Sequence, residues 1–291
     1  MNLPEIAPPA LGSRCMLLAP RPSLAACVRG HIVRSTVGLE LDHEQRFNHF
    51  PASPLCAMCW LFQGKAAVVR RGEQWVCEAT PRIALIGPHS GPVVSHNPGV
   101  VEALMVAMTP AAVYALSGVS INALVNRVVP LETVFDASWR AMAQAVLQAP
   151  DDASRIRLVE EFLEPRWALV RDSAVSRADR FHYWVENLGL RALQSGVGSS
   201  LRQAERRIKQ WAGMPMRDLR RMVRAEDAFF RAAFAYEDGS LDLAGVAADG
   251  GYADQAHMCR EVRRITGLSP VALLKAIERD EMYWMYRLRD V

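Results

Sequence analysis

Hydrophobic and polar positions follow two different periods along the 291-residue chain. Between residues 55 and 108, short apolar runs alternate with turn residues, which is typical of strands in an antiparallel sheet. We expect a short helix at 23–30 and strands at 31–37, 55–62, 66–69, 74–79, 82–87, 92–95 and 101–108. Many short strands at close spacing predict a β-sandwich or barrel in this part of the chain.

After Pro110 the apolar residues recur at helical spacing. We expect helices at 111–118, 137–148, 152–170, 181–194, 201–213, 216–236, 242–249 and 254–267, with another beginning at Pro270. The fold class is therefore α+β: a β-rich N-terminal part with a helical pair, then an all-α C-terminal part. The charged stretch 171–180 is the expected linker, which gives domains at 1–170 and 181–291.

The stretch 242–267 has the pattern of a helix-turn-helix. Asp242 and Asp254 are candidate N-caps, a glycine turn separates two short helices, and Gly267 ends the second helix. In the second helix the apolar stripe is formed by Met258, Val262 and Ile265. The opposite face carries Gln255, Ala256, Cys259, Arg260 and Arg263. Gln bonds adenine and Arg bonds guanine bidentately, so this face suits base reading.

A second basic helix precedes it. Ser200 and Gln203 form a capping box, and Ala204, Ile208 and Trp211 give the helix an apolar face. The exposed face carries Arg202, Glu205, Arg206 and Lys209. From 202 to 224 eight Arg and Lys residues stand against two acidic residues, a local charge of +6 that suits phosphate contacts.

The expected helix at 216–236 separates the two units. At ~1.5 Å per residue it spans roughly 30 Å, close to the ~34 Å between successive major-groove segments on one face of DNA. A rigid connector of this length can place two recognition helices in adjacent grooves.

The segment 251–270 closely resembles the second helix-turn-helix of the AraC/XylS family of bacterial transcription regulators. The matching residues are Gly251, Tyr252, Asp254, Gln255, His257, Arg260, Arg263, Arg264, Gly267, Ser269 and Pro270. The resemblance implies a cupin-like effector-binding and dimerisation domain at 1–170, with dimerisation through the helical pair. It implies promoter DNA, RNA polymerase, a small-molecule effector and a second copy of the chain as partners, and no cofactor.

The resemblance also assigns DNA contacts. Base contacts are expected from Arg202, Glu205 and Arg206 in the first recognition helix and from Gln255, Ala256 and Arg260 in the second. Phosphate contacts are expected from Arg207, Lys209, Arg220 and Arg263.

Length and composition bear on the number of domains and on the compartment of the protein. The length allows two domains, each with its own core. We find no apolar run near the ~18 residues of a membrane span and no basic region of a signal peptide, so we expect a cytoplasmic protein. Six cysteines are sparse in a chain of this size and are expected to be reduced.

Thiol, metal and effector-binding chemistry were considered in the N-terminal part of the chain. Cys56 and Cys59 lie in an apolar strand, where residues three apart face opposite sides, so we interpret them as core residues. The N-terminal histidines lack the spacing of a cupin metal site, and we expect neither a metal nor catalysis. An effector pocket in the N-terminal barrel would draw on Arg46, His49, Trp60 and Trp75.

Two alternatives remain open. The first is a metal or thiol sensor, or an enzyme, in the N-terminal barrel. The second is a ligand-independent regulator whose N-terminal half serves dimerisation. The terminal segment 278–291 carries Tyr283, Trp284 and Tyr286, and we expect it to pack against the N-terminal domain.

Overall fold

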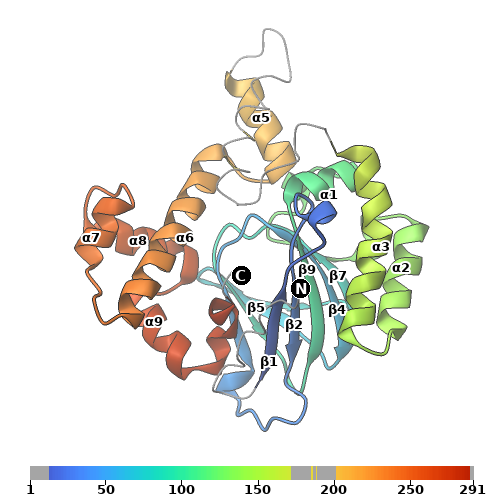
Figure 1. The fold of residues 1–291 in the computed structure, drawn as a ribbon, viewed down its shortest axis with the longest axis horizontal. Coiled ribbons are helices and arrows are strands. Elements are labelled where there is room, and N and C mark those ends of the chain that lie inside the picture. Colours follow the sequence, from blue (N-terminus) through green and yellow to red (C-terminus); the bar gives the residue numbers. More distant parts are fainter. Residues whose placement is uncertain (1–12, 172–184, 186–187, 189–200, 289–291) are drawn as a thin grey trace.

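The computed structural model describes residues 13–171, 185, 188 and 201–288. It shows an N-terminal region of antiparallel β-sheet flanked by helices and a C-terminal region of helices (Figure 1). This confirms the predicted α+β class. Of the expected linker at 171–180 only residue 171 is described, and of the expected helix at 181–194 only residues 185 and 188, both helical. The expected cap at Ser200 lies outside the described residues.

The larger sheet has six antiparallel strands in the order β1-β2-β9-β4-β7-β10. Their bounds are β1 Arg14–Leu18, β2 Val28–Ser35, β4 Cys56–Gln63, β7 Ile83–Ile86, β9 Glu102–Met108 and β10 Val128–Pro130. Strands β4 and β9 pair near the centre of this sheet, where Met58 lies opposite Val106 and both are buried.

The second sheet has four antiparallel strands in the order β3-β8-β5-β6. Their bounds are β3 Phe47–Phe50, β5 Ala67–Arg71, β6 Gln74–Ala79 and β8 Val93–His96. The β3–β4 connection, residues 51–55, leads from one sheet to the other and reaches the C-terminal helices, as described below.

Most of the predicted strands are confirmed to within a few residues, but the short helix expected at 23–30 is wrong. A 3-10 turn, η1, covers Pro22–Leu24, and the chain enters β2 at Val28. Val28 pairs with Met108 of β9 and is fully buried, so cross-strand pairing decides its conformation. The prediction also omitted β1, β3 and β10, which are short and lack a clear alternation of apolar and polar residues.

Helix α1, Pro110–Ser117, follows β9, and helices α2, Ala137–Gln148, and α3, Asp152–Val170, follow β10. Asp136 caps α2 by accepting from the Ser138 and Trp139 N–H groups, and Asp151 caps α3 by accepting from the Ser154 N–H. In Figure 1, α2 and α3 stand together beside β4 and β7. Their apolar residues, among them Trp139 and Leu163, join the strands in the largest core cluster.

The two cysteines of β4 belong to different cores, as predicted. Cys56 packs in the cluster shared with α2 and α3, whereas Cys59 packs with Leu61, Ala84 and Ala103 on the other side of the sheet. Burial raises the pKa of each thiol to about 12. Such thiols stay protonated at neutral pH and are poor nucleophiles.

The C-terminal region consists of helices α5 to α9 and a terminal 3-10 segment, η6. Their bounds are α5 Leu201–Ala212, α6 Met216–Glu237, α7 Leu243–Asp249, α8 Gln255–Thr266, α9 Pro270–Arg279 and η6 Glu281–Arg287. Figure 1 shows α5 rising at the top of the molecule and the long α6 running from it towards α7 and α8 on the left. These bounds match the predicted helices to within a residue or two.

Candidate DNA-binding surface

Helix α8 is defined at both ends by local chemistry. The Asp254 side chain accepts a hydrogen bond from the His257 N–H at 2.6 Å, which caps the first turn. Gly267 ends the helix at φ +87°, a left-handed conformation that favours glycine. Met258 and Val262 are buried, so helical geometry turns Gln255, Ala256 and Arg260 outwards, where all three are exposed.

Helix α7 leads into α8 through a tight turn. The Asp242 side chain caps α7 by accepting from the Ala244 N–H at 2.9 Å. A Cβ at Gly245 would lie 2.7 Å from Asp242 Oδ2, so glycine inside this short helix makes room for the capping carboxylate. Buried Val246 and Ala247 pack with Met258 in one cluster. The α7–α8 pair is therefore the helix-turn-helix unit that the sequence predicts.

A partly buried ion pair joins α8 to the long helix α6. Arg224 of α6 donates three hydrogen bonds to the Glu261 carboxylate of α8, at 2.8, 2.9 and 3.0 Å. The guanidinium also lies 4.5 Å from the centre of the Tyr252 ring. Burial raises the pKa of the Tyr252 hydroxyl, which therefore stays neutral. Sequence reasoning missed the role of Glu261, although its place three residues after Met258 on the apolar side of α8 is a visible clue.

Helix α5 presents the second set of predicted contacts. Ala204 and Ile208 are buried, and Arg202, Glu205, Arg206 and Lys209 are exposed. Arg207 is half-buried and engaged in contacts within the protein. The exposed residues lie at helical spacing, so they form one face that can enter a groove.

The basic strip from 202 to 224 is partly neutralised inside the protein. Arg221 contacts Asp218 at 3.4 Å and Glu261 at 3.8 Å, and Arg224 is held by Glu261. By contrast, exposed Arg220 of α6 and Arg263 of α8 form no ion pair within the described part of the chain. Both guanidinium groups are therefore open to solvent.

Helix α6 is the connector between the two units. Its 22 residues span about 33 Å at ~1.5 Å per residue. The buried face includes Ala225, Ala228, Ala232 and Ala233, small residues that let neighbouring helices approach closely. The predicted length of this helix is confirmed, and its role as a spacer between two recognition helices stays a prediction.

The four residues expected to line an effector pocket lie in four different settings. Arg46 donates hydrogen bonds to the carbonyls of Leu41 and Pro98. The His49 ring stacks on Tyr283 at 4.6 Å, and burial beside Arg70 lowers its pKa to about 4. Trp60 is completely buried and donates to the Ala143 carbonyl at 3.1 Å. Trp75 is 73% exposed.

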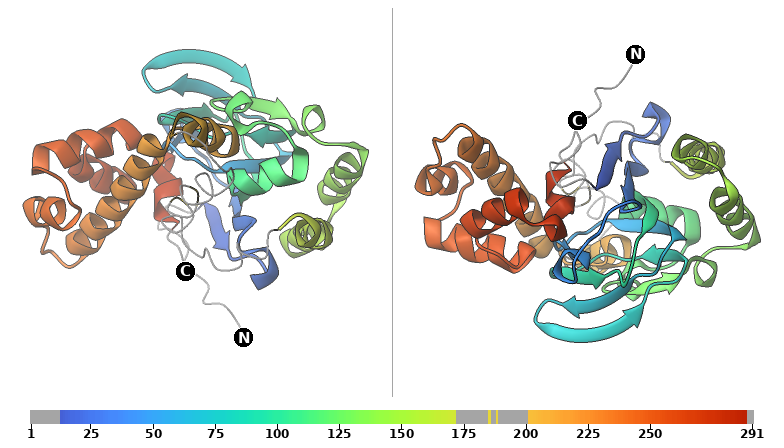
Figure 2. Two further views of the ribbon diagram at one scale, coloured as in Figure 1. Left: turned by 90° about the horizontal axis from the view of Figure 1, so that it is seen from above. Right: turned by 90° about the horizontal axis from the view of Figure 1, so that it is seen from below.

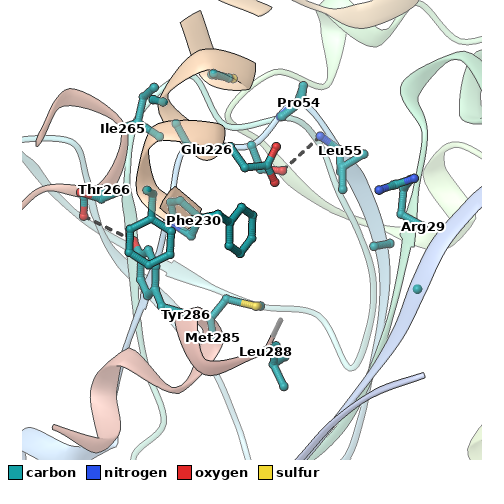
Figure 3. A pocket seen from close by; sticks show the side chains of 18 of the residues that line it. Arg29, Pro54, Leu55, Glu226, Phe230, Ile265, Thr266, Met285, Tyr286 and Leu288 are labelled. Carbon is teal, nitrogen blue, oxygen red and sulfur yellow. Dashed lines mark hydrogen bonds between the residues drawn. The ribbon is translucent and has the colours of Figure 1, made fainter. Parts of the chain in front are cut away.

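A different cavity, of about 260 Å³, lies between the N-terminal sheet and the C-terminal helices (Figure 3). One wall comes from β2, β9 and the 51–55 connection, and the other from α6, α8 and η6. The lining is mostly apolar, with Phe229, Phe230 and Met285 on the helical side. Arg29 and Glu226 bring opposite charges to its walls. No sequence pattern indicates this cavity, because its walls are distant along the chain.

The described residues contain no group of three or more His, Cys, Asp or Glu that could hold a metal ion. Within the same residues, no helix is long and apolar enough to cross a membrane.

Comparison with known proteins identifies the helical region. Residues 194–276 match the family model described as a helix-turn-helix domain. A search of curated proteins found no match.

Solved structures similar to this chain include three of ToxT from Vibrio cholerae. The P21 form is 11% identical, covers 79% of this chain and 94% of its own, and has a TM-score of 0.37. An apo form of a ToxT point variant from strain SCE256 is 10% identical, covers 84% and 97%, and has a TM-score of 0.39. ToxT bound to (E)-4-(8-methylnaphthalen-1-yl)but-3-enoic acid is 11% identical, covers 79% and 95%, and has a TM-score of 0.35.

The capped helices, the exposed polar faces and the family match together define a DNA-binding protein of the helix-turn-helix class. More specifically, residues 194–276 form an AraC-type helix-turn-helix domain, which confirms the resemblance to the AraC/XylS regulators.

Proposed function

We propose that this protein is a sequence-specific transcription regulator whose helices α5 and α8 read adjacent major-groove segments. The observation that carries the proposal is the pair of exposed polar faces, one on each helix, separated by the 22-residue α6. Neither face is needed for packing, because the opposite side of each helix supplies the buried residues.

The side chains suit specific bases. Arg202, Arg206 and Arg260 can each bond guanine, and Gln255 can bond adenine. Glu205 can accept from cytosine, and the Ala256 methyl can contact the thymine methyl. In this proposal Arg207, Lys209, Arg220 and Arg263 bind phosphate and set the register of the protein on the duplex.

The test is selection from a pool of randomised duplexes at two salt concentrations. Wild type should enrich two short boxes about one helical turn apart, roughly 10 base pairs centre to centre. Arg206→Ala should relax the preference at one box and Arg260→Ala at the other. Each change should cost ~1–3 kcal/mol of discrimination.

Arg279→Ala is the matched control for these variants, because Arg279 is also exposed but lies at the end of α9. It should leave the enriched sequence unchanged. Binding that depends on salt but shows no preference in the pool would contradict the proposal. A uniform loss on all sequences in Arg260→Ala would reassign Arg260 to phosphate contact.

We also propose that a small molecule modulates this activity. The cavity between the sheet and the helices supports this, because a ligand there would touch both the N-terminal domain and the DNA-binding domain. The apolar lining, with Arg29 and Glu226 at its walls, suits a largely apolar molecule with one charged or polar group.

A melting-temperature screen of such molecules tests this idea. A compound that raises the melting temperature of wild type should raise it much less in Ala107→Leu, because Ala107 lines the cavity and the larger side chain takes up part of it. A shift that persists undiminished in Ala107→Leu would place the ligand elsewhere. If no compound in a broad screen shifts the melting temperature or the DNA affinity, the ligand-independent alternative is favoured.

Dimerisation through α2 and α3 and contact with RNA polymerase complete the proposed function. The proposal of a dimer rests on the family resemblance and on the surface position of this helical pair in Figure 1. Sedimentation equilibrium with and without the enriched duplex would measure the number of copies bound.

A further inference from the structure

The terminal 3-10 segment η6 binds the N-terminal domain through buried side chains. We call Glu281–Arg287 the C-terminal clasp. Glu281, Tyr283, Trp284 and Tyr286 are all buried in it. Figures 1 and 2 show this red segment beside the blue strands that begin the chain, far from it in sequence. The clasp is therefore the meeting point of the two ends of the described chain.

A buried charge network joins the clasp to the larger sheet. Arg34 of β2 donates a hydrogen bond to Glu281 Oε1 at 2.7 Å, and the Ser13 hydroxyl donates to the same oxygen. On the clasp side, Arg287 donates to Glu281 Oε2 at 3.0 Å. Glu281 and Arg34 are almost fully buried, so each charge depends on its partner. Removing one member of such a pair leaves the other uncompensated.

Aromatic contacts extend the same interface to the smaller sheet. Trp284 donates from its indole nitrogen to Asn48 Oδ1 of β3 at 2.8 Å. The Arg34 guanidinium lies 4.5 Å from the centre of the Trp284 ring. Tyr283 stacks on His49 at 4.6 Å. One short segment thus contacts strands of both sheets.

The clasp is also fixed to the recognition helix α8. The Tyr286 hydroxyl donates to the Thr266 carbonyl, at the last residue of α8. Arg287 donates from Nε to the Ile277 carbonyl of α9 at 2.8 Å. The clasp is therefore bonded on one side to the sheets and on the other to α8 and α9, so separating the two regions would break one of these sets of contacts.

Each recognition helix is held separately by the N-terminal domain at its C-terminal end. Gln210, near the end of α5, donates to the Tyr114 hydroxyl of α1 at 3.2 Å. Near the end of α8, the Ile265 carbonyl accepts from the Ala52 N–H at 2.7 Å. Figure 1 shows α5 at the top of the molecule and α8 at its left side. The N-terminal domain thus takes part in setting where each of them lies.

We propose that the C-terminal clasp locks the helix-turn-helix domain onto the N-terminal domain, and that it must open before α5 and α8 can read one duplex together. Two boxes on one face of DNA require both helices to present their first turns to the same side. The closed clasp holds the end of α8 to the sheets, while α5 is bonded separately to α1, so contacts with the N-terminal domain constrain the two helices independently. This inference rests on the proposed function for its second half, whereas the lock itself does not require DNA.

Glu281→Gln tests the lock, with Glu278→Gln as its matched control. Both changes remove one negative charge, but Glu278 is exposed on α9 and contacts Tyr236 of the same domain. The reporter is Cys15, whose sulfur accepts a hydrogen bond from Arg34 beside Glu281. Cys77 is exposed and serves as the rate standard, while Cys56 and Cys59 are buried and report loss of the fold.

Without DNA, Glu281→Gln should speed alkylation of Cys15 about tenfold over wild type and Glu278→Gln, a change typical of coupling between sites. The alkylation rate of Cys77 should be unchanged, and Cys56 and Cys59 should stay unreactive. An unchanged Cys15 rate in the folded variant would overturn the lock. If Cys56 and Cys59 react, Glu281→Gln has lost its fold, and Trp284→Phe is tested in its place. This variant keeps an aromatic ring and removes the hydrogen bond to Asn48.

With DNA, Glu281→Gln should bind a two-box duplex about tenfold more tightly and a duplex carrying the α8 box alone with unchanged affinity. In wild type, the two-box duplex should speed alkylation of Cys15. A faster Cys15 rate together with an unchanged or weaker two-box affinity would overturn the requirement for opening. Absence of any sequence preference in all variants would instead contradict the proposed function and leave the Cys15 result standing.

Discussion

The Arg224–Glu261 pair should contribute measurably to the stability of the helix-turn-helix domain, and a double-mutant cycle can isolate its contribution. The Glu261 side chain is 7% exposed and that of Arg224 is 35% exposed, so the carboxylate is the member that loses more hydration. Arg224→Ala leaves Glu261 buried with weaker neighbours, Arg221 at 3.8 Å and His257 at 3.9 Å. The expected cost is about 3 kcal/mol.

Glu261→Ala should cost less, about 1 to 2 kcal/mol, because the partly exposed Arg224 can regain water. The double variant should then be more stable than the sum of the single losses predicts. A coupling energy of about 2 kcal/mol is expected for groups that share three hydrogen bonds. The measurement is urea unfolding of wild type, both single variants and the double variant at pH 7.

The Arg231–Asp227 pair on the same helix is the control. Its N–O distance is also 2.8 Å, but the side chains are 49% and 52% exposed. Solvent screening should reduce its coupling energy to about 0.3–0.5 kcal/mol. If the Arg224–Glu261 coupling is no larger than this, burial does not strengthen the pair and the reasoning is refuted.

Three further predictions concern the N-terminal domain. Burial, with a smaller effect of Arg71, lowers the pKa of His89 from 6.5 to about 4, so the unfolded chain takes up a proton before the folded one does. Protonation of His89 should therefore lower the free energy of unfolding by about 3 kcal/mol as pH falls from 6.5 to 4, with no effect above pH 7. The urea midpoint of His89→Gln should fall less over that range than the midpoint of wild type. Gly87→Ala should destabilise by about 1–3 kcal/mol, because its Cβ would lie 1.9 Å from the Leu124 carbonyl oxygen; an unchanged melting temperature would contradict this. Leu163→Ala should lose about 2–5 kcal/mol, since Leu163 is fully buried between α3 and the sheet, and urea unfolding measures the loss.

The recognition helices were predictable because their determinants are local. Asp254 lies at the N-cap, Gly267 ends α8, and the apolar stripe repeats at helical spacing, so neighbouring residues suffice to place the exposed face. The same holds for the bounds of α2 and α3, where Asp136 and Asp151 cap helices with periodic apolar residues.

The N-terminal domain was predictable as a β-rich region but not in its details. The alternation in β4 correctly separated Cys56 from Cys59, because alternate residues of a strand face opposite sides. Nothing local indicates that Val28 belongs to a strand, since its pairing partner Met108 is distant in sequence. The residues predicted to line a pocket were chosen by residue type alone, and they do not lie together in the fold. Trp60, for example, is completely buried and bonded to the Ala143 carbonyl.

Patterns among neighbouring residues were enough to define the class of this protein: an α+β chain with a helix-turn-helix domain whose exposed faces carry Arg, Gln and Glu. Periodicity and capping are properties of consecutive residues, and they decide which side of a helix faces solvent. Only the folded chain shows that Arg34 meets Glu281, that Arg224 meets Glu261, and that the described cavity lies between the sheet and the helices. These contacts join residues far apart along the chain, and burial makes each charge depend on a partner that folding alone brings within reach.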